Sequence, residues 1–159
     1  KPDFIRVEAD EITYNLHIMV RYEIEKMIFN QDLSVEDIPS TWNKMMEDWF
    51  GITVPSDSMG CLQDIHWSMG AFGYFPTYTL GNLYAAQLLQ TMSNQLGDID
   101  EIIKSGDWSP MLDWLRKNIH DKGSVMSPAE LIEAATGNAP SPEPFLNYVE
   151  EKYSKLYNL

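Results

Sequence analysis

The fold class is decided by residues 8–29, which read EADEITYNLHIMVRYEIEKMIF. Apolar side chains recur in this stretch at steps of three and four positions, at Ile12, Leu16, Met19, Val20, Ile24, Met27 and Ile28. That spacing puts them on one face of an α-helix. We therefore predict a helix from Glu8 to Phe29 with this face buried.

Turn and capping residues divide the next part of the chain. Pro39 suits the first turn of a second helix, and Gly51 suits its end. We expect the apolar side chains of that helix to pack in the core, at Trp42, Met45, Met46, Trp49 and Phe50. Residues 52–73 are dense in glycine and serine, which predicts a loop ordered by its aromatic side chains. A long helix is predicted from Pro76 to about Leu96.

Shorter helices with clear start signals are predicted for the remainder. One opens at Ser109-Pro110 and runs through Ile119. Ser127-Pro128-Ala129-Glu130 is a capping box, and Gly137 is a natural stop for the helix that it opens. A stiff connector containing Pro140, Pro142 and Pro144 precedes a last amphipathic helix, 145–157. No alternating strand pattern is present, so the predicted fold is all-α, with residues 1–159 forming one helical segment.

The amino-acid composition limits the kinds of molecule that this protein can bind. The net charge of −13 repels nucleic acid and disfavours an anionic membrane surface. No stretch approaches the roughly 18 apolar residues of a membrane span. The single cysteine, Cys61, excludes an internal disulfide and favours a cytoplasmic, reducing location. The chain begins at Lys1 without an apolar leader, and we expect it to start inside a longer protein.

A complete catalytic constellation is not found in the sequence. The histidines His17, His66 and His120 are isolated, and none belongs to an HEXXH motif of the kind that binds catalytic zinc. A glycine-rich phosphate loop is also missing. We therefore predict no metal site within these residues.

Two segments nevertheless concentrate polar chemistry. The first is Ile5-Arg6-Val7-Glu8-Ala9-Asp10, and the second runs from Gly60 to Tyr78 with Gln63, Asp64 and His66 among its side chains. Donors and acceptors on a loop held by aromatic residues are typical of binding sites. The ordinary alternatives are a surface ion pair of Arg6 with Glu8 and Asp10, a structural role for His66, and core positions for the tyrosines.

These segments resemble a known family. Ile5-Arg6-x-x-Ala9-Asp10 and Gly60-x-x-Gln63-Asp64-x-His66-Trp67 match two signature motifs of the carboxypeptidase Taq metallopeptidases at every signature position, and the similarity covers the whole chain. The resemblance implies a mostly helical homodimer that removes single amino acids from peptide C-termini with zinc or another divalent metal. The family's HEXXH lies upstream of the first motif. The chain would then be a C-terminal part that binds no metal and is inactive alone.

The resemblance also implies roles for particular residues. Arginine binds a carboxylate with a planar fork, so Arg6 is the candidate for the substrate's terminal carboxylate, with Gln63 and Asp64 as further substrate-binding residues. The candidate donors that stabilise the transition state are His66, Tyr78 and Tyr74. The competing interpretation is a non-catalytic, acidic helical protein-interaction module.

Overall fold

The computed structural model describes residues 2–30 and 32–159, and these residues form helices and loops without a strand. The all-α prediction is confirmed. The chain divides into two compact units, Lys1–Leu80 and Gly81–Leu159, and each has its own packing. That residues 1–159 form one part of a larger catalytic domain stays a prediction.

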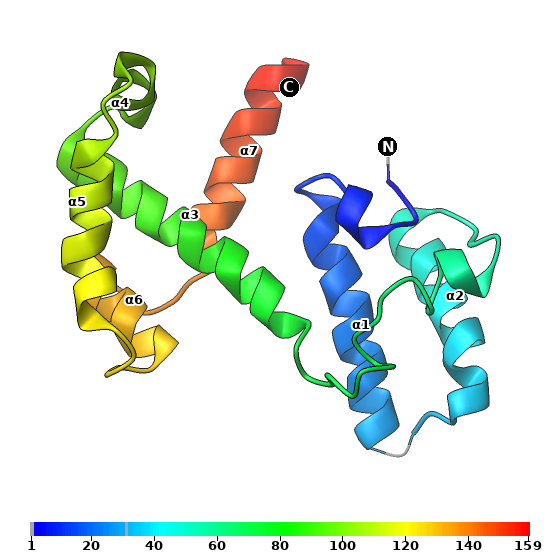
Figure 1. Cartoon of the computed structure of the whole chain (residues 1–159). Helices are drawn as coiled ribbons and strands as arrows, with labels where there is room; N and C mark the ends of the chain where they lie inside the picture. The colour runs from blue at the N-terminus through cyan, green and yellow to red at the C-terminus, as the bar shows by residue number, and fades with distance from the viewer. Residues whose placement is uncertain (1, 31) are drawn as a thin grey trace. The chain divides into compact units, whose positions relative to one another are not determined.

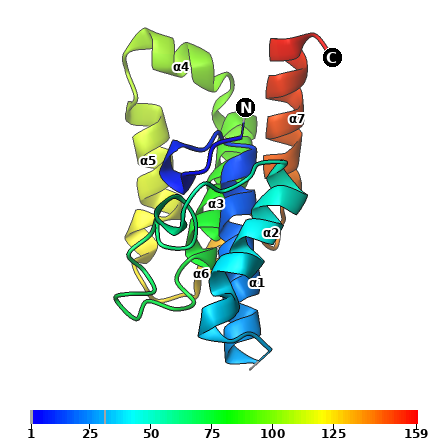
Figure 2. The ribbon, with the colours of Figure 1, turned by 90° about the vertical axis from the view of Figure 1, so that its right-hand side faces the viewer.

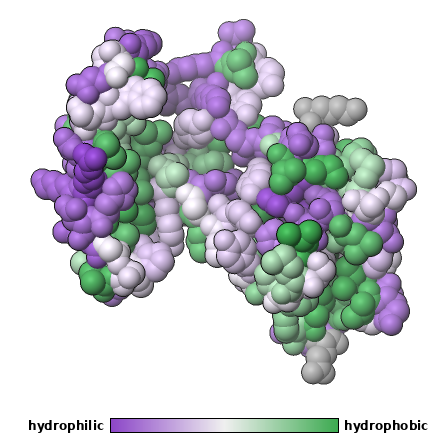
Figure 3. All heavy atoms as spheres, in the orientation of Figure 1, coloured by the Kyte–Doolittle hydropathy of each residue, from purple (hydrophilic) through white to green (hydrophobic). Residues whose placement is uncertain are grey.

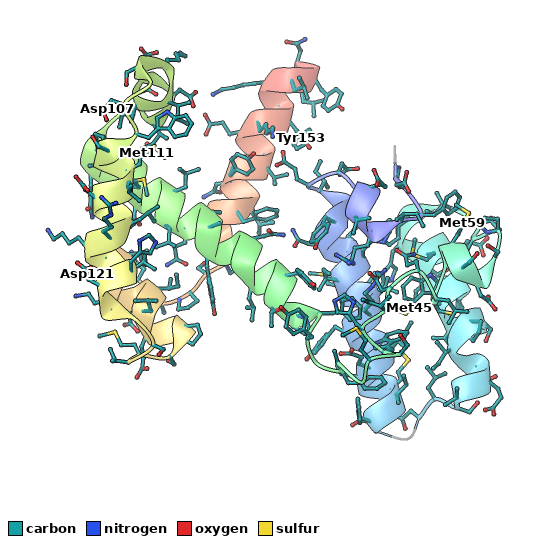
Figure 4. The ribbon with its side chains drawn as sticks, in the orientation of Figure 1. Met45, Met59, Asp107, Met111, Asp121 and Tyr153 are labelled. Carbon is teal, nitrogen blue, oxygen red and sulfur yellow. The ribbon has the colours of Figure 1, made fainter. Side chains whose placement is uncertain are left out.

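The first unit is built on two helices that lie side by side, α1 (Thr13–Phe29) and α2 (Ile38–Phe50) (Figures 1 and 2). Short 3-10 helices flank them at Arg6–Glu8, Val35–Asp37 and Asp57–Met59. The buried core between the helices and the following loop consists of Val20, Ile24, Trp42, Met46, Phe50 and Cys61. Met45, labelled in Figure 4, packs against this core.

Helix α1 begins later than predicted, at Thr13 instead of Glu8. The cause is Asp10, whose Oδ1 accepts hydrogen bonds from the N–H groups of Ile12 and Thr13, both at 2.9 Å. A side chain that satisfies backbone donors in this way favours a turn over a continuous helix. Residues 6–8 consequently form a separate 3-10 turn, and this turn sets the position of Arg6.

The predicted buried faces need a correction. Ile12, just before α1, is 44% exposed, Met19 on α1 is 45% exposed, and Trp49 on α2 is 41% exposed. Val20 and Ile24 are buried as expected. The remaining buried positions of α1 include polar and charged side chains, namely Asn15, His17, Arg21 and Glu25.

The segment after α2 is a loop, as predicted. Gly51 ends α2 with a φ of +66°, a backbone conformation that costs glycine little. Aromatic rings hold the loop: Trp67 meets Trp42 edge-on at 6.2 Å between ring centres, and meets Phe75 edge-on at 6.1 Å. Phe75 is 1% exposed, so the end of the loop is anchored just before the next helix.

The remaining helices follow the capping signals closely. Helix α3 (Pro76–Leu96) begins in the first unit, α5 is Ser109–Asn118, and α6 is Pro128–Thr136. The capping box at Ser127 is present, with its Oγ accepting from the N–H of Glu130. A 3-10 turn at His120–Lys122 follows α5.

Two features of the second unit differ from the prediction. Helix α4 (Ile99–Ser105) was not predicted, and it starts where the Asp98 carboxylate accepts from two backbone N–H groups. Helix α7 begins at Glu143 instead of Phe145 and ends at Tyr157. Proline in its first turn explains the earlier start, because that position needs no N–H donor.

The second unit has a smaller core. Among the described residues, its buried apolar side chains are Met92, Trp114, Ile132 and Ala135. Apolar side chains are also visible beside α5 in Figure 3, and Met111 of that helix is labelled in Figure 4. A groove of about 470 Å³ in this unit is lined by Ile103, Trp108, Met111, Leu112 and Leu115. Of the helices described, none is long and apolar enough to cross a membrane.

Candidate active site

The two polar segments of the sequence meet at the carboxylate of Asp64. Arg6 donates from Nη2 to Oδ1 at 2.7 Å, and its Nε lies 3.2 Å from both oxygens. Arg21 of α1 donates from Nε to Oδ2 at 2.8 Å, and its Nη2 lies 2.6 Å from the same oxygen. The alternative interpretation, a surface ion pair of Arg6 with Glu8 and Asp10, is therefore wrong. Its partner lies 58 positions away, and Arg6 itself is buried.

Burial and pairing pull the ionisation of this cluster in opposite directions. Burial alone would raise the pKa of Asp64, but hydrogen bonds and charge from Arg6 and Arg21 outweigh it and lower that pKa. For Arg6, burial opposes the charged form, and Asp64 still raises its pKa. Burial lowers the pKa of Arg21 to about 10, which keeps it protonated at neutral pH. The cluster thus contains two cations and one anion.

Gln63 fastens the loop to the N-terminal segment. Its Oε1 accepts the backbone N–H of Arg6 at 2.8 Å. Its Nε2 donates to the carbonyl oxygens of Phe4, Met59 and Gly60 at 3.0–3.1 Å. The side-chain amide is thus engaged within the chain, where it fixes the backbone of Arg6 against the loop. Direct substrate binding by Gln63 and Asp64 stays a prediction.

His66 lies beside this cluster and contacts a tyrosine. Its Nε2 is 3.0 Å from the hydroxyl of Tyr78, at the start of α3, and its ring packs on Phe75 at 4.3 Å between centres. The Nδ1 atom is 3.9 Å from Asp64 Oδ1, which is too long for a hydrogen bond. Asp64 therefore pairs with the two arginines and does not orient the imidazole of His66 directly.

Tyr74 and Tyr78 lie beside the same cluster of Arg6, Asp64 and His66. Tyr74 meets Tyr78 edge-on at 5.5 Å and remains 51% exposed. The guanidinium carbon of Arg6 lies 5.1 Å from the ring centre of Tyr78. The structure consequently brings all the predicted site residues together within the first unit: Arg6, Gln63, Asp64, His66, Tyr74 and Tyr78.

Sequence reasoning missed the contribution of α1. Tyr14 accepts a hydrogen bond from Arg6 Nη1 at 3.0 Å, and Glu25 accepts from the Trp67 indole at 2.8 Å and from the Gly73 N–H at 3.0 Å. With Arg21, these side chains repeat at helical spacing along α1. A polar stripe at this spacing was the available signal, but such a stripe usually faces solvent.

Comparison with known proteins identifies the family. Residues 1–153 match the family model described as carboxypeptidase Taq (M32) metallopeptidase. The chain belongs to this family. Carboxypeptidase 1 of Bacillus subtilis is 49% identical over 159 residues, covering 100% of this chain and 32% of that protein. Thermostable carboxypeptidase 1 of Thermus thermophilus is 50% identical over 157 residues, covering 99% of this chain and 31% of that protein.

A solved structure supports the M32 assignment at the level of the backbone. The M32 carboxypeptidase from Deinococcus radiodurans superposes with a TM-score of 0.96 at 38% identity, covering 100% of this chain and 32% of that one. The present chain therefore spans about a third of the length of these relatives.

The M32 family implies a divalent metal in the full-length enzyme. Within residues 2–30 and 32–159, no three His, Cys, Asp or Glu side chains form a group that could hold a metal ion. The carboxylate of the candidate site, that of Asp64, is already shared by two arginines. The described residues of this chain therefore do not fit the metal.

Proposed function

We propose that this chain is the C-terminal part of a metal-dependent carboxypeptidase that removes single amino acids from peptide C-termini. In this proposal the segment supplies substrate-carboxylate binding and transition-state stabilisation. The divalent metal, zinc in our proposal, and the activation of water are supplied by other parts of the full-length protein. The segment alone is inactive. We also propose, from the family resemblance, that the full-length protein is a cytoplasmic homodimer acting on peptides with a free C-terminus, with no nucleic-acid partner.

The observation that supports this proposal is the uneven charge around Asp64. Arg6 and Arg21 share one carboxylate, so one positive charge is left over in a largely buried place. An uncompensated buried charge costs several kcal/mol. An anionic ligand such as a peptide's terminal carboxylate would relieve that cost, and an internal peptide bond would not.

Arg6 is the arginine that can reach such a ligand. A guanidinium carries five N–H groups, and the contacts to Asp64 and Tyr14 use one on each nitrogen. One N–H on Nη1 and one on Nη2 are left for a carboxylate. This is the paired geometry in which arginine recognises carboxylates. Gln63 and Asp64 contribute to substrate binding by holding Arg6 in place.

His66, Tyr78 and Tyr74 act on the reacting end of the substrate in this proposal. The His66–Tyr78 contact leaves a hydrogen-bonded pair beside the carboxylate-binding arginine. Donors placed where negative charge develops stabilise a transition state, and losing one typically lowers turnover by about 10²–10³. Tyr74 is the most exposed of the three, and in this proposal it donates from the solvent side.

The test uses the full-length enzyme that carries this segment. In Arg6→Ala, kcat/KM should fall far more for a peptide with a free C-terminus than for its C-terminally amidated counterpart. Arg116→Ala removes an exposed arginine and serves as the control. An equal loss on both peptides would contradict the carboxylate role of Arg6.

A second variant separates catalysis from metal binding. His66→Ala should lower kcat by about 10²–10³ while the metal content of the purified enzyme stays unchanged. Loss of the metal would show instead that His66 supports the metal site. Carboxypeptidase activity in the purified 159-residue chain would overturn the proposal that the segment is inactive alone.

A further inference from the structure

Helix α1 carries two buried charges that belong to neither signature segment. Arg21 is 1% exposed and Glu25 is 4% exposed, one helical turn apart. Charged side chains are almost never this buried unless they are paired. Both reach the loop that carries His66, but they reach different parts of it.

Arg21 is enclosed on all sides. Besides its contacts to Asp64 Oδ2, its Nη1 donates to the backbone carbonyl of His17 at 2.7 Å. Its guanidinium carbon lies 4.6 Å from the ring centre of Trp42 and 5.2 Å from that of Phe75. With 1% exposure, Arg21 has no surface to offer a substrate. Any effect on binding must pass through Asp64.

The two oxygens of Asp64 make their shortest contacts with different arginines, although Arg6 Nε also lies 3.2 Å from both of them. Oδ2 is held by Arg21, while Oδ1 takes the short contact from Arg6 Nη2. Because Oδ2 is engaged, the carboxylate cannot turn to bind both terminal nitrogens of Arg6. The charge of Arg21 also offsets the charge of Asp64, so the charge of Arg6 is not cancelled.

We propose that Arg21 is a positioning residue for recognition of the substrate carboxylate. It holds Asp64 in the orientation that leaves two N–H groups of Arg6 free, and it maintains the net positive charge that attracts the carboxylate. This inference rests on the proposed function, because it takes Arg6 as the residue that binds the substrate's C-terminus.

Glu25 is the residue on α1 with which Arg21 can be compared. It accepts hydrogen bonds from Trp67 and Gly73, so it ties down the same loop from the same helix. These bonds do not involve Asp64 or Arg6. If buried charges on α1 served only to hold the loop, removing the charge of Arg21 and that of Glu25 would have the same kinetic effect.

The experiment compares KM and kcat in the full-length enzyme for a peptide with a free C-terminal carboxylate. Arg21→Gln should raise KM about tenfold, the size expected for losing one charge at this range, while kcat stays within about threefold. Arg21→Lys keeps the charge but loses the fork, so KM should rise by only about threefold. Lys26→Gln removes a positive charge from an exposed position of the same helix and should leave KM unchanged. Glu25→Gln should not raise KM.

An unchanged KM in Arg21→Gln overturns the inference, as does an equal rise in Lys26→Gln or Glu25→Gln. If Arg21→Gln does not fold, Arg21→Lys decides: a raised KM with kcat retained supports the role, and an unchanged KM overturns it. A wild-type enzyme without carboxypeptidase activity would remove the proposed function itself. An active wild type with insensitive Arg21 variants would remove only the positioning role.

Discussion

The two units of the molecule bury different kinds of side chain. In Lys1–Leu80 the buried polar and charged positions are Arg6, Asn15, His17, Arg21 and Glu25, whereas in Gly81–Leu159 the buried polar side chain is the uncharged Gln87. The charged pairs of the second unit, such as Arg116 with Asp113, lie exposed on its helices. Buried charges destabilise a fold unless they are fully paired, and their concentration in the first unit supports our proposal that the substrate binds there.

In the second unit, the uncharged side chain of Gln87 anchors a connecting segment. Its Nε2 donates to Thr136 Oγ1 and to the carbonyls of Asn138 and Ala139, and its Oε1 accepts the N–H of Ser141. One amide therefore holds the connector between α6 and α7. It fastens a backbone, as Gln63 does in the first unit, and these hydrogen-bond partners are all uncharged. Comparable loop anchoring thus occurs in both units, and the charge cluster is what separates them.

Breaking the charge cluster should give the largest effect on stability. Asp64→Ala leaves two buried arginines without their carboxylate, and we expect the free energy of unfolding to fall by about 3–5 kcal/mol. Asp113→Ala removes the carboxylate of an exposed pair in the second unit and should have no measurable effect. Urea unfolding of the 159-residue chain, followed by circular dichroism, measures both. Similar losses in the two variants would contradict the contrast between the units.

Truncating the apolar core should give the next largest effect. Met46 is 0% exposed in the core of the first unit, so Met46→Ala should cost about 3 kcal/mol by leaving a cavity. Met111 lines the open groove of the second unit, and Met111→Ala should cost less than about 1 kcal/mol because solvent already reaches its surroundings. The same urea titrations provide the measurement. A cost for Met111→Ala equal to that for Met46→Ala would show that the groove is covered.

Local signals explain why the helices could be predicted so well. Pro39, Gly51, the Ser127–Glu130 capping box and Gly137 each act on neighbouring backbone groups, and all of them operate as expected. Capping depends on residues within one turn, so sequence spacing is enough to identify it. Where a less distinctive local contact decided the boundary, as at Asp10, the prediction placed the helix start too early.

Only the site residues that lie within the two segments resembling the family could be predicted from the sequence. The resemblance pointed to Arg6, Asp64 and His66, and the structure places them together. It gave no indication that Arg21 pairs with Asp64 across 43 positions, because nothing in the spacing of α1 distinguishes a buried arginine from a solvated one. Burial depends on the surface that packs against a residue, and for Arg21 that surface includes Trp42 of α2 and the loop after α2.

Acid should weaken the first unit selectively. His17 is 0% exposed and packs on the ring of Phe50 at 4.6 Å, and burial together with the nearby charge of Arg21 lowers its pKa to about 4. Asp3, Arg21 and Arg6 are the charged groups that act on it. Because the unfolded chain binds the proton near pH 6.5 and the folded chain does not, stability is full above that pH. It should fall by about 3 kcal/mol as the pH drops from 6.5 to 4.

Urea midpoints measured between pH 4 and pH 7 test this dependence on His17. His17→Gln should flatten the profile over that range, whereas His120→Gln, at an exposed position of the second unit, should leave it unchanged. The lowered pKa of Asp64 adds a further loss only below the ordinary pKa of aspartate, near 4, where its carboxylate begins to protonate in the unfolded chain. A steep profile that survives in His17→Gln would assign the acid sensitivity to other groups.

The smallest predicted loss of stability comes from removing a helix cap in the second unit. Its helix α6 depends on a local device, the capping box in which Ser127 accepts from the Glu130 N–H and the Glu130 carboxylate accepts from the Ser127 N–H at 2.8 Å. Ser127→Ala should cost about 1 kcal/mol, read as a shift in the urea midpoint. Ser34→Ala is the matched control in the first unit, because the Ser34 hydroxyl bonds to Asp37 Oδ2 without capping a helix. If Ser127→Ala is as silent as Ser34→Ala, then packing against other surfaces, and not local capping, determines where α6 begins.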